Sequence, residues 1–448
     1  MQLERSVSTT QAILYGVGVI VGAGIYTLIG VGAGIAGNAL WISFIIAAIV
    51  AYLTALSYSE LSSKFSKEGA ETLYVNKAFN NQKLAFFIGF LSIITWVVSS
   101  ATVAFGFASY AKLFIPFTPT LIAIGAIILF SIINFLGIQK GVKINNILTI
   151  VTISGLLLII IFGLRFVGQV NLFLGFDGTN LLENSFSLIP SLFSAAALVF
   201  FAYLGFEGLA NIGEETKEPK KTIPLAIIVS LSIATLLYVA VAIISVSVVS
   251  PIELLSAATA NSLTQGPLAL VAEKAIDPSF GFWLSLIALC ATGSTLIVLL
   301  NVSSRIIYGL SEQHFFPKVF GLINPKTKTP FVAVIVATVL SIICALVGNL
   351  VLLGNMATMS TFLLFFAVNS SLIAIKQKEK SLNDYDNPFS LKRLSFPALL
   401  GALFCLFMFL TQFWFPVNVF GIEVPMIGIG AVVFAISIPL YYLFKKFD

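Results

Sequence analysis

Two stretches of this sequence interrupt apolar segments that would otherwise be continuous: Gly16-Val-Gly-Val-Ile-Val-Gly-Ala-Gly-Ile25 near the start and Phe200-Phe-Ala-Tyr-Leu-Gly-Phe-Glu-Gly208 near the middle. Glycine costs a helix about 1 kcal/mol relative to alanine, so the four glycines within residues 16–24 favour unwinding. Unwound backbone at membrane depth is stable only where protein or a polar cavity satisfies its N–H and C=O groups. Two such breaks, one in each half of a chain, are typical of a secondary transporter with a binding site near the bilayer midplane.

The composition places the chain among membrane proteins. Hydrophobic residues make up 58% of its 448 residues and charged residues only 10%, against roughly 25% charged in a soluble globular domain. Twelve apolar stretches of about 18 residues or more are each long enough to cross a ~30 Å hydrocarbon core as a helix. They cover residues 11–35, 38–60, 84–111, 119–138, 145–164, 188–212, 223–249, 282–311, 331–350, 357–375, 396–415 and 425–444. We therefore predict an all-α polytopic membrane protein with 12 transmembrane helices.

The net charge of +5 is explained by membrane orientation. If both termini are cytoplasmic, 20 of the 24 lysine and arginine residues fall on the inner side. Only Lys112, Arg165 and Lys274 are then outside, with Arg305 near the inner end of the eighth span. This asymmetry follows the positive-inside rule, so it implies no nucleic acid partner. We expect a multi-pass protein of the plasma (cell) membrane with both termini in the cytoplasm.

The spans divide into two halves of five. Each half begins with a broken span, and charged loops at 62–71 and 214–221 occupy corresponding places in the two halves. Because the first span starts inside and the sixth starts outside, the halves must have opposite orientations, which is the pattern of inverted repeats. We predict a first repeat of spans 1 to 5 over residues 1–165, a second repeat of spans 6 to 10 over 188–375, and spans 11 and 12 over 396–448.

Four motifs carry a resemblance to a known family. They are Gly18-Val-Ile-Val-Gly-Ala-Gly-Ile25; Tyr58-Ser-Glu-Leu-Ser-Ser63; Phe201-Ala-Tyr-Leu-Gly-Phe-Glu207 with Glu214-Glu-Thr-Lys-Glu-Pro-Lys-Lys-Thr-Ile-Pro224; and Arg305-Ile-Ile-Tyr308 with Asn324-Pro-Lys-Thr-Lys-Thr-Pro330. Over nearly its whole length the chain resembles permeases of the amino acid, polyamine and organocation (APC) superfamily, and most closely their cationic-amino-acid-transporter-like branch. The resemblance implies the leucine-transporter (LeuT) type of five-plus-five inverted repeat. It also implies alternating access, in which helices 1, 2, 6 and 7 move against helices 3, 4, 8 and 9.

The two breaks offer what an α-amino acid needs in a site of low dielectric constant. The half-helix after Gly22 presents free N–H groups and a positive dipole end to a carboxylate, and the carbonyls released at the breaks suit an ammonium group. The open alternative is that the glycines only permit close packing of helices. The resemblance assigns carboxylate donors to Ala23 and Gly24 and ammonium acceptors to Ile20, Phe201 and Leu204, and the break itself adds the carbonyl of Ala202.

Two side chains near the second break have expected roles. Phe201 stands where several relatives place a bulky aromatic over the substrate, so the resemblance implies a gate. Glu207 is the only carboxylate that we place well inside a span, and the rest of the pocket is predicted to be apolar. An intramembrane carboxylate is a functional candidate. Either Glu207 stays protonated and ties its helix to neighbouring backbone, which we favour, or it titrates in a proton relay.

A cation site is predicted between helices 1 and 8. Ala291, Ser294 and Thr295, spaced i, i+3 and i+4, place one carbonyl and two hydroxyls on one helix face, a set of hard oxygens suited to a small cation. The resemblance adds the helix 1 carbonyls of Gly18 and Val21 and makes Na⁺ the expected ion. The ordinary alternative is that both hydroxyls bond back to their own helix.

The coupling ion is left open between Na⁺, H⁺ and none, and no cofactor is expected. Many proton-coupled relatives place a lysine of helix 5 in the cavity between helices 1 and 8. By position this chain has Thr152 there, and Lys143 is nine residues away, about 13.5 Å along a helix. The missing lysine therefore favours sodium over a protein ammonium group.

We predict a secondary active transporter of small or apolar neutral amino acids, with an amino acid and membrane lipid as partners, working as a monomer or a homodimer. An amino acid exchanger, a proton-coupled permease for cationic amino acids or polyamines, and a non-transporting amino acid sensor of the same fold remain alternatives. A channel would need polar or charged rings along a pore, and an enzyme would need a nucleophile and base or a metal cluster. The sequence suggests neither arrangement.

Overall fold

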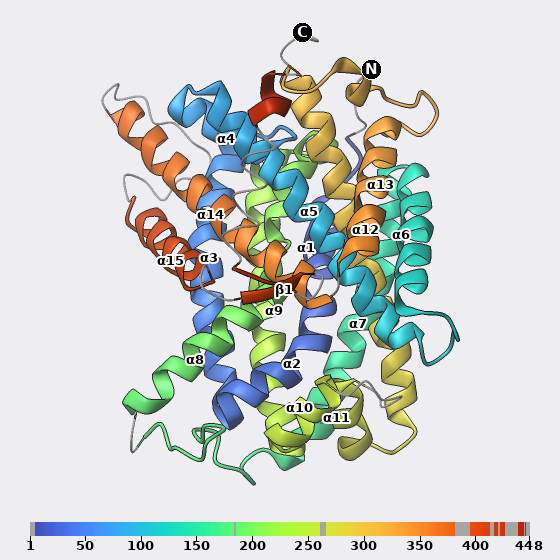
Figure 1. Cartoon of the computed structure of the whole chain (residues 1–448), viewed down its shortest axis with the longest axis vertical. Helices are drawn as coiled ribbons and strands as arrows, with labels where there is room; N and C mark the ends of the chain where they lie inside the picture. Colours follow the sequence, from blue (N-terminus) through green and yellow to red (C-terminus); the bar gives the residue numbers. More distant parts are fainter. Residues whose placement is uncertain are drawn as a thin grey trace.

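The computed structural model describes residues 5–182, 185–259, 266–348, 350–380, 395–412, 416–419, 422–425, 438–442 and 444. These residues form a bundle of long helices (Figure 1). Helix α4 lies at one end of the bundle, and α10 and α11 lie at the opposite end. We call these the α4 end and the α10 end.

The predicted first half contains α1 (Thr9–Ile20), α2 (Ala23–Ala36), η1 (Gly37–Ala39), α3 (Leu40–Lys64), α4 (Ala70–Phe79), α5 (Gln82–Ala111), α6 (Pro119–Phe135), α7 (Ile138–Gly163) and η2 (Leu164–Phe166). The predicted second half contains α8 (Ser185–Val199), η3 (Phe200–Tyr203), η4 (Phe206–Glu215), α9 (Pro219–Val248), α10 (Pro251–Thr259), α11 (Pro267–Ala275), α12 (Phe280–Glu312), η5 (Lys318–Gly321), α13 (Phe331–Val347) and α14 (Leu350–Lys380). Helix α15 (Phe396–Gln412) and strands β1 (Pro416–Val419) and β2 (Ile422–Pro425) follow.

Seven of the described segments are long and apolar enough to cross a membrane, by length and composition: Thr9–Lys64, Gln82–Ala111, Ile138–Phe166, Leu188–Glu215, Pro219–Val248, Phe280–Glu312 and Leu352–Glu379. Three shorter apolar helices, Pro119–Phe135, Phe331–Val347 and Phe396–Leu410, coincide with further predicted spans. The segment Thr9–Lys64 contains two predicted spans, and the twelfth, 425–444, lies largely outside the described residues. A polytopic membrane protein is confirmed, whereas the count of twelve stays a prediction.

One part of the described chain departs from the predicted all-α class. Strands β1 and β2 form an antiparallel hairpin in which Pro416 lies opposite Pro425. The hairpin follows α15, between the last two predicted spans. β-Branched residues such as Val417 and Val424 favour extended backbone, and a proline at a strand end removes no ladder hydrogen bond from the centre. The all-α prediction is therefore corrected by one short hairpin.

The first predicted break is present between α1 and α2. Helix α1 starts at a capping box, in which the Ser8 hydroxyl accepts from the Gln11 N–H and the Gln11 side chain accepts from the Ser8 N–H. It ends at Ile20, and α2 begins three residues later at Ala23. The intervening Gly22 packs so closely on α12 that a methyl group there would overlap the Thr295 hydroxyl.

The second predicted break is present between η3 and η4. Gly205 has φ = +118°, a conformation that favours glycine, and Leu204 before it is extended, so η3 and η4 are separate helices. A methyl group on Gly205 would lie 2.6 Å from a methyl of Val19 in α1, and one on Gly24 would overlap the backbone of Ala202. The two breaks, far apart in sequence, therefore lie side by side.

Candidate functional site

The first break exposes the N-terminus of a helix. Gly22 is the N-cap residue of α2, and no side chain caps this end. Its own N–H donates to the Ile20 carbonyl at 2.8 Å. The first turn of α2, which starts at Ala23 and Gly24, points toward the break. Uncapped first-turn N–H groups together with the helix dipole favour an anion. This is the geometry that the predicted carboxylate donors require.

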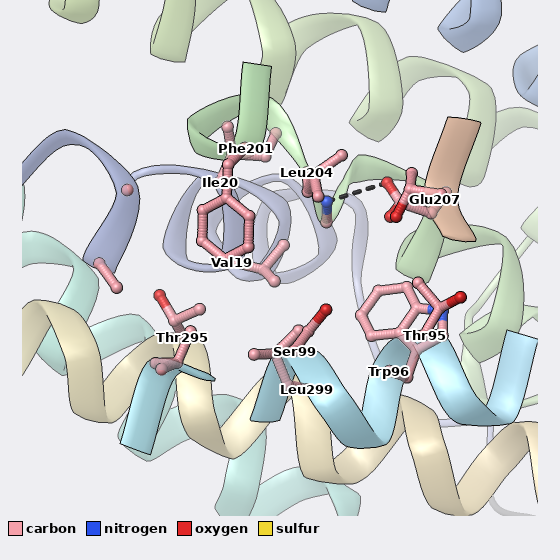
Figure 2. Close-up of a pocket in the computed structure, with 15 residues that line it drawn as sticks. Val19, Ile20, Thr95, Trp96, Ser99, Phe201, Leu204, Glu207, Thr295 and Leu299 are labelled. Carbon is pink, nitrogen blue, oxygen red and sulfur yellow. Dashed lines mark hydrogen bonds between the residues drawn. The ribbon is translucent and has the colours of Figure 1, made fainter. Parts of the chain in front are cut away.

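At the second break a carboxylate accepts a hydrogen bond from the backbone. The Leu204 N–H donates to the Phe201 carbonyl at 3.3 Å and completes one tight turn, after which the backbone leaves helical geometry at Leu204 and Gly205. The Gly205 N–H donates to Oε2 of Glu207 at 2.9 Å (Figure 2). Glu207 thus satisfies a backbone N–H that the break releases, which is the structural role that we favoured from the sequence. The Glu207 side chain also lines the cavity described below.

The residue that joins the two breaks was missed by the sequence analysis. The hydroxyl of Tyr238 in α9 lies 2.5 Å from the carbonyl oxygen of Ile20 and 2.9 Å from that of Ala202. A buried tyrosine hydroxyl requires a hydrogen-bond partner, and here it has one on each broken helix. The signal in the sequence was a tyrosine in the middle of an apolar span, which gives no indication of the two carbonyls that it reaches.

A cavity of about 30 Å³ lies between the breaks and helices α5 and α12 (Figure 2). It has room for about two water molecules, so an amino acid enters only if side chains move. Its lining residues are Val19, Ile20, Ala23, Gly24, Thr95, Trp96, Ser99, Val103, Phe201, Leu204, Gly205, Glu207, Thr295, Leu299 and Thr361. Among the predicted substrate residues, all but Ala202 line this cavity, and the backbone of Ala202 packs against Gly24, which does.

Helix α5 supplies one wall that sequence reasoning also missed. Thr95, Ser99 and Val103, spaced four residues apart, lie on one face of the helix and turn it toward the cavity. Trp96 is 2% exposed, and its indole N–H has no hydrogen-bond partner among the described residues. The cavity wall is mainly apolar, as predicted, and Thr95, Ser99, Thr295 and Glu207 add polar side chains to it.

The predicted cation site is assembled as a set of neighbouring oxygens. Ser294 Oγ lies 3.4 Å from the Gly18 carbonyl oxygen and 2.9 Å from that of Ala291. Thr295 Oγ1 lies 3.3 Å and 3.1 Å from the same two oxygens. Each hydroxyl bonds back to its own helix, as the ordinary alternative expects, and also reaches helix α1, whereas binding of a cation stays a prediction. Val21, the remaining predicted ligand, is buried at the break.

Helix α7 closes the other side of Gly18 with residues that the sequence analysis did not select. A methyl group on Gly18 would overlap the Thr149 hydroxyl and lie 3.0 Å from Oδ1 of Asn145, an oxygen with no hydrogen-bond donor among the described residues. Thr152 lies about one turn further along: its hydroxyl donates to the Leu148 carbonyl, and its own carbonyl accepts from Tyr26 in α2. Asn145 and Thr149 therefore lie closer to the predicted cation site.

Comparison with known proteins identifies the family. A family model described as amino acid permease matches residues 7–436, nearly the whole chain. The chain belongs to the amino acid permease family. The APC resemblance seen in the sequence is thereby confirmed, and the protein is a transporter of that superfamily, not an enzyme.

The permease is similar to several curated transporters. It is 29% identical over 442 residues to the branched-chain amino acid permease BcaP of Bacillus subtilis, covering 92% of this chain and 89% of the relative. It is 29% identical over 402 residues to the methylthioribose transporter of Bacillus subtilis, covering 85% and 83%. With cationic amino acid transporter 4 of Mus musculus it shares 26% identity over 410 residues, covering 85% of this chain and 61% of the relative.

A buried ion pair links several elements at the α4 end of the permease. The Arg305 guanidinium in α12 donates to both carboxylate oxygens of Glu215, at 2.9 Å and 2.8 Å, and both side chains are fully buried. The carbonyl of Glu215 accepts from the N–H groups of Ser6 and Val7, which precede α1. Both residues of the ion pair lie in motifs that carried the family resemblance. The pair links the second broken helix to α12 and to the segment before the first.

Another buried carboxylate, that of Glu71, lies at the start of α4. Glu71, in the first turn of α4, accepts hydrogen bonds from Tyr58 at 3.2 Å, Ser92 at 3.4 Å and Asn211 at 3.3 Å. The Asn211 carbonyl oxygen Oδ1 accepts in turn from the Ala70 N–H at 2.9 Å. Burial raises the pKa of the Glu71 carboxyl above its usual value, and these hydrogen bonds oppose the rise. The network fixes α4 against the second broken helix.

Proposed function

We propose that this permease is a secondary active transporter of small or apolar neutral amino acids that works by alternating access. The observation that carries the proposal is the position of Tyr238, whose hydroxyl reaches a carbonyl of both broken segments beside the cavity. In the proposal the substrate carboxylate binds the N–H groups at the start of α2. The substrate ammonium binds carbonyls released at the breaks. The amino acid permease family implies an amino acid substrate.

The hydrogen bonds that the carbonyls at the breaks already accept determine how we propose that the substrate ammonium binds. The Ile20 carbonyl already accepts from the Gly22 N–H, and the one hydroxyl hydrogen of Tyr238 is donated either to Ile20 or to Ala202. A carbonyl oxygen has two lone pairs, so a substrate ammonium binds the Ile20 carbonyl when Tyr238 donates to Ala202 and no longer to Ile20. Substrate binding would then loosen the link between the breaks, and the two half-helices could move relative to α9.

The small volume of the cavity supports a small substrate and a side chain that moves to admit it. About 30 Å³ cannot accept an amino acid until a side chain leaves. Phe201 is partly buried and lines the cavity from the second break (Figure 2). We propose that Phe201 swings aside to admit the substrate and returns over it, as the gate role requires.

A cationic substrate is the second candidate, and one observation favours it. Glu207 is the acidic side chain among the described residues that line the cavity, and it could face the charged end of a lysine-like or polyamine-like substrate. Against this, one of its oxygens already accepts from Gly205 at 2.9 Å. The neutral substrate class is therefore preferred.

The coupling ion in the proposal is Na⁺, held by the carbonyls of Gly18 and Ala291 and the hydroxyls of Ser294 and Thr295. The support is that these oxygens already lie within 2.9 to 3.4 Å of one another. The buried Oδ1 of Asn145 beside Gly18 adds another hard oxygen to the neighbourhood. Proton coupling through Glu207 and ion-free exchange are the alternatives, and the transport assay below separates them.

The orientation in the proposal places the α4 end in the cytoplasm of a cell whose plasma membrane holds the permease as a monomer or homodimer. Lysines gather at this end, including Lys64, Lys67, Lys77, Lys220 and Lys221. An excess of lysine marks the cytoplasmic side. A cysteine in place of Lys67 or Lys326 should therefore react with impermeant reagents only from inside, and labelling from outside would overturn the orientation.

Transport into proteoliposomes tests the proposal. Uptake of leucine, valine, alanine, serine and lysine is measured with a sodium gradient, a proton gradient or neither, with protein-free liposomes as the control. We expect uptake of neutral amino acids that a sodium gradient drives. Lysine as the preferred substrate would favour the Glu207 alternative, and counterflow without either gradient would favour exchange. Failure of every amino acid to enter would reject the transport function.

A further inference from the structure

A second and larger cavity, of about 730 Å³, lies at the α4 end and shares no residue with the substrate cavity. Three separate parts of the chain form it: the segment before α1, the region from the end of α3 through α4, and the start of α9. Phe65 and Leu73 contribute an apolar surface to its wall. Its basic lining residues are Arg5, Lys64, Lys67, Lys77, Lys220 and Lys221.

The positive charge of this basic cavity exceeds what the neighbouring carboxylates neutralise. Lys64 forms an ion pair with Glu379, and Lys221 lies 4.0 Å from Glu218, where both side chains are about four-fifths exposed. Exposed pairs of this kind contribute little. Helix α9 begins at the cavity wall, and its N-cap residue Glu218 makes no side-chain cap, so the positive end of the helix dipole adds to the charge. The cavity is therefore built to attract an anion.

The position of the cavity relative to the ends of the apolar spans indicates which class of anion it binds. Lys64 is the last residue of one apolar span, and Pro219 is the first residue of another. Both lie where helices leave the hydrocarbon core, which is the level of lipid headgroups. On α9, Lys221 and Leu225 share one face at i and i+4, and Leu236 continues it. Leu225 is 50% exposed and Leu236 is 74% exposed, so an apolar strip runs from the basic cavity into the membrane.

We propose that the basic cavity binds the phosphate group of an anionic membrane lipid, with an acyl chain lying along Leu225 and Leu236. Lys67 belongs to the first repeat and Lys220 to the second, so one phosphate would connect both halves. Arg5 immediately precedes the two N–H groups that donate to the Glu215 carbonyl, and the Lys217 N–H returns a hydrogen bond to Val7 at 2.9 Å. A bound lipid therefore stabilises the arrangement in which the segment before α1 is held against the second broken helix.

The test follows thermal unfolding of the purified full-length protein while short-chain phosphatidylglycerol, short-chain phosphatidylcholine or inorganic phosphate is added. A ligand that binds the folded state raises the melting temperature by mass action, which gives an apparent Kd. We expect phosphatidylglycerol to stabilise and the other two to have little effect. Equal stabilisation by phosphatidylcholine, whose phosphate is balanced by the positive choline group, would overturn the selectivity for an anionic lipid. Equal stabilisation by inorganic phosphate would assign the cavity to a soluble phosphate and overturn the lipid.

A matched pair of triple variants locates the site. Lys67→Gln, Lys220→Gln and Lys221→Gln together remove three charges from the cavity, and Lys318→Gln, Lys326→Gln and Lys328→Gln remove three outside it. Each cavity lysine should cost about fivefold in apparent Kd, which corresponds to about 1 kcal/mol near an anionic lipid. The second triple should leave Kd within about twofold. Equal losses in both would show a diffuse charge effect and overturn the proposal.

A single variant covers the case in which the first triple variant fails to fold. Lys220 is exposed, so charge reversal there leaves the core intact. Lys220→Glu should weaken phosphatidylglycerol binding more than Lys220→Gln does. Equal binding in wild type and both variants would overturn the proposal.

Discussion

Tyr238 places its hydroxyl 2.5 Å from the carbonyl oxygen of Ile20, the last residue of α1, and the same hydroxyl lies 2.9 Å from Ala202 in the other broken helix. One hydroxyl carries one hydrogen, so it donates to one of the two carbonyls at a time. This leaves acceptor capacity at the breaks that a substrate ammonium can use. The contact joins segments 218 and 36 residues from Tyr238 and so links the two halves of the proposed site.

Removal of this hydroxyl should affect substrate binding more than folding. Tyr238→Phe should lower the free energy of unfolding by about 1 kcal/mol, the typical worth of one buried hydrogen bond. It should also change the apparent Kd for the preferred amino acid. Tyr110→Phe is the control, because Tyr110 donates a similar buried hydrogen bond at 2.9 Å to the Tyr26 carbonyl, and neither residue lines the cavity. Thermal unfolding and substrate titration of both variants check this, and equal effects on binding would contradict it.

The carboxylate donors can be tested by the removal of one N–H group. Ala23 is the first residue of α2, the position at which a helix tolerates proline. Ala23→Pro should weaken substrate binding about 10-fold to 100-fold, because a hydrogen bond to a charged group is worth about 1.5–3 kcal/mol. Ala23→Ser retains the N–H and should bind normally. Wild-type affinity in a folded Ala23→Pro protein would place the carboxylate elsewhere.

Glu207→Gln should retain binding of a neutral amino acid. The amide oxygen of glutamine can accept the Gly205 N–H that Glu207 accepts at 2.9 Å, so the second break stays closed. Uptake is measured across a range of pH in both proteins. Loss of uptake together with loss of its pH dependence, at unchanged melting temperature, would instead assign Glu207 to a proton relay.

Sodium should stabilise the protein through the oxygens between α1 and α12. The melting temperature should rise with sodium as RT ln(1 + [Na⁺]/Kd) predicts, and Thr295→Ala should reduce that rise because it removes one ligand oxygen. Thr292→Ala is a matched control, since the Thr292 hydroxyl bonds only to carbonyls of its own helix, Ala288 and Leu289, among the described residues. Identical melting in sodium and choline would reject the sodium site and leave exchange as the leading mechanism.

Glu68 should make stability fall as pH rises. It lies in the loop between α3 and α4, is 1% exposed, and neither carboxyl oxygen has a hydrogen-bond partner in the described part of the chain. Burial raises the pKa of the Glu68 carboxyl well above its usual range; Glu215, Glu214 and Glu312 add to the rise, and Arg305 opposes it. A folded-state pKa above the unfolded value gives stability that is complete below the unfolded pKa and is lost as pH rises through the folded pKa.

Replacement of this side chain by a neutral one isolates the effect. Glu68→Gln should unfold at nearly the wild-type temperature at about pH 5 and at a higher temperature at about pH 8, because the variant pays no cost for a buried charge. Glu218→Gln is the control, since the Glu218 side chain is 78% exposed. A pH profile of Glu68→Gln that matches the wild type would show that Glu68 does not titrate in this range.

The sequence predicted the features of the site that depend on local backbone. Gly22 and Gly205 mark the two breaks because a side chain at either would meet Thr295 or Val19, and Gly205 also has positive φ. Local glycine content carries that information before any tertiary contact is known. Hydropathy likewise predicted the apolar segments of the described chain, because the bilayer imposes span length on each helix separately.

The other residues of the site could not be predicted, because they are brought together by tertiary contacts. No local pattern indicates that Tyr238 reaches Ile20, or that Asn145 and Thr149 lie closer to Gly18 than Thr152 does, because each contact depends on the packing of helices distant in sequence. The same holds for Thr95 and Ser99, whose spacing is equally typical of core hydroxyls.

The central claim is that backbone groups at the two breaks hold the α-carboxylate and the α-ammonium of one substrate. Competition with uptake of the preferred amino acid tests it most directly, using two analogues with the same side chain, one without the carboxylate and one without the amine. If the account is right, each analogue competes at least about 10-fold more weakly than the intact amino acid, because each leaves charged-group hydrogen bonds unmade. Competition by either analogue at the strength of the intact amino acid would contradict it.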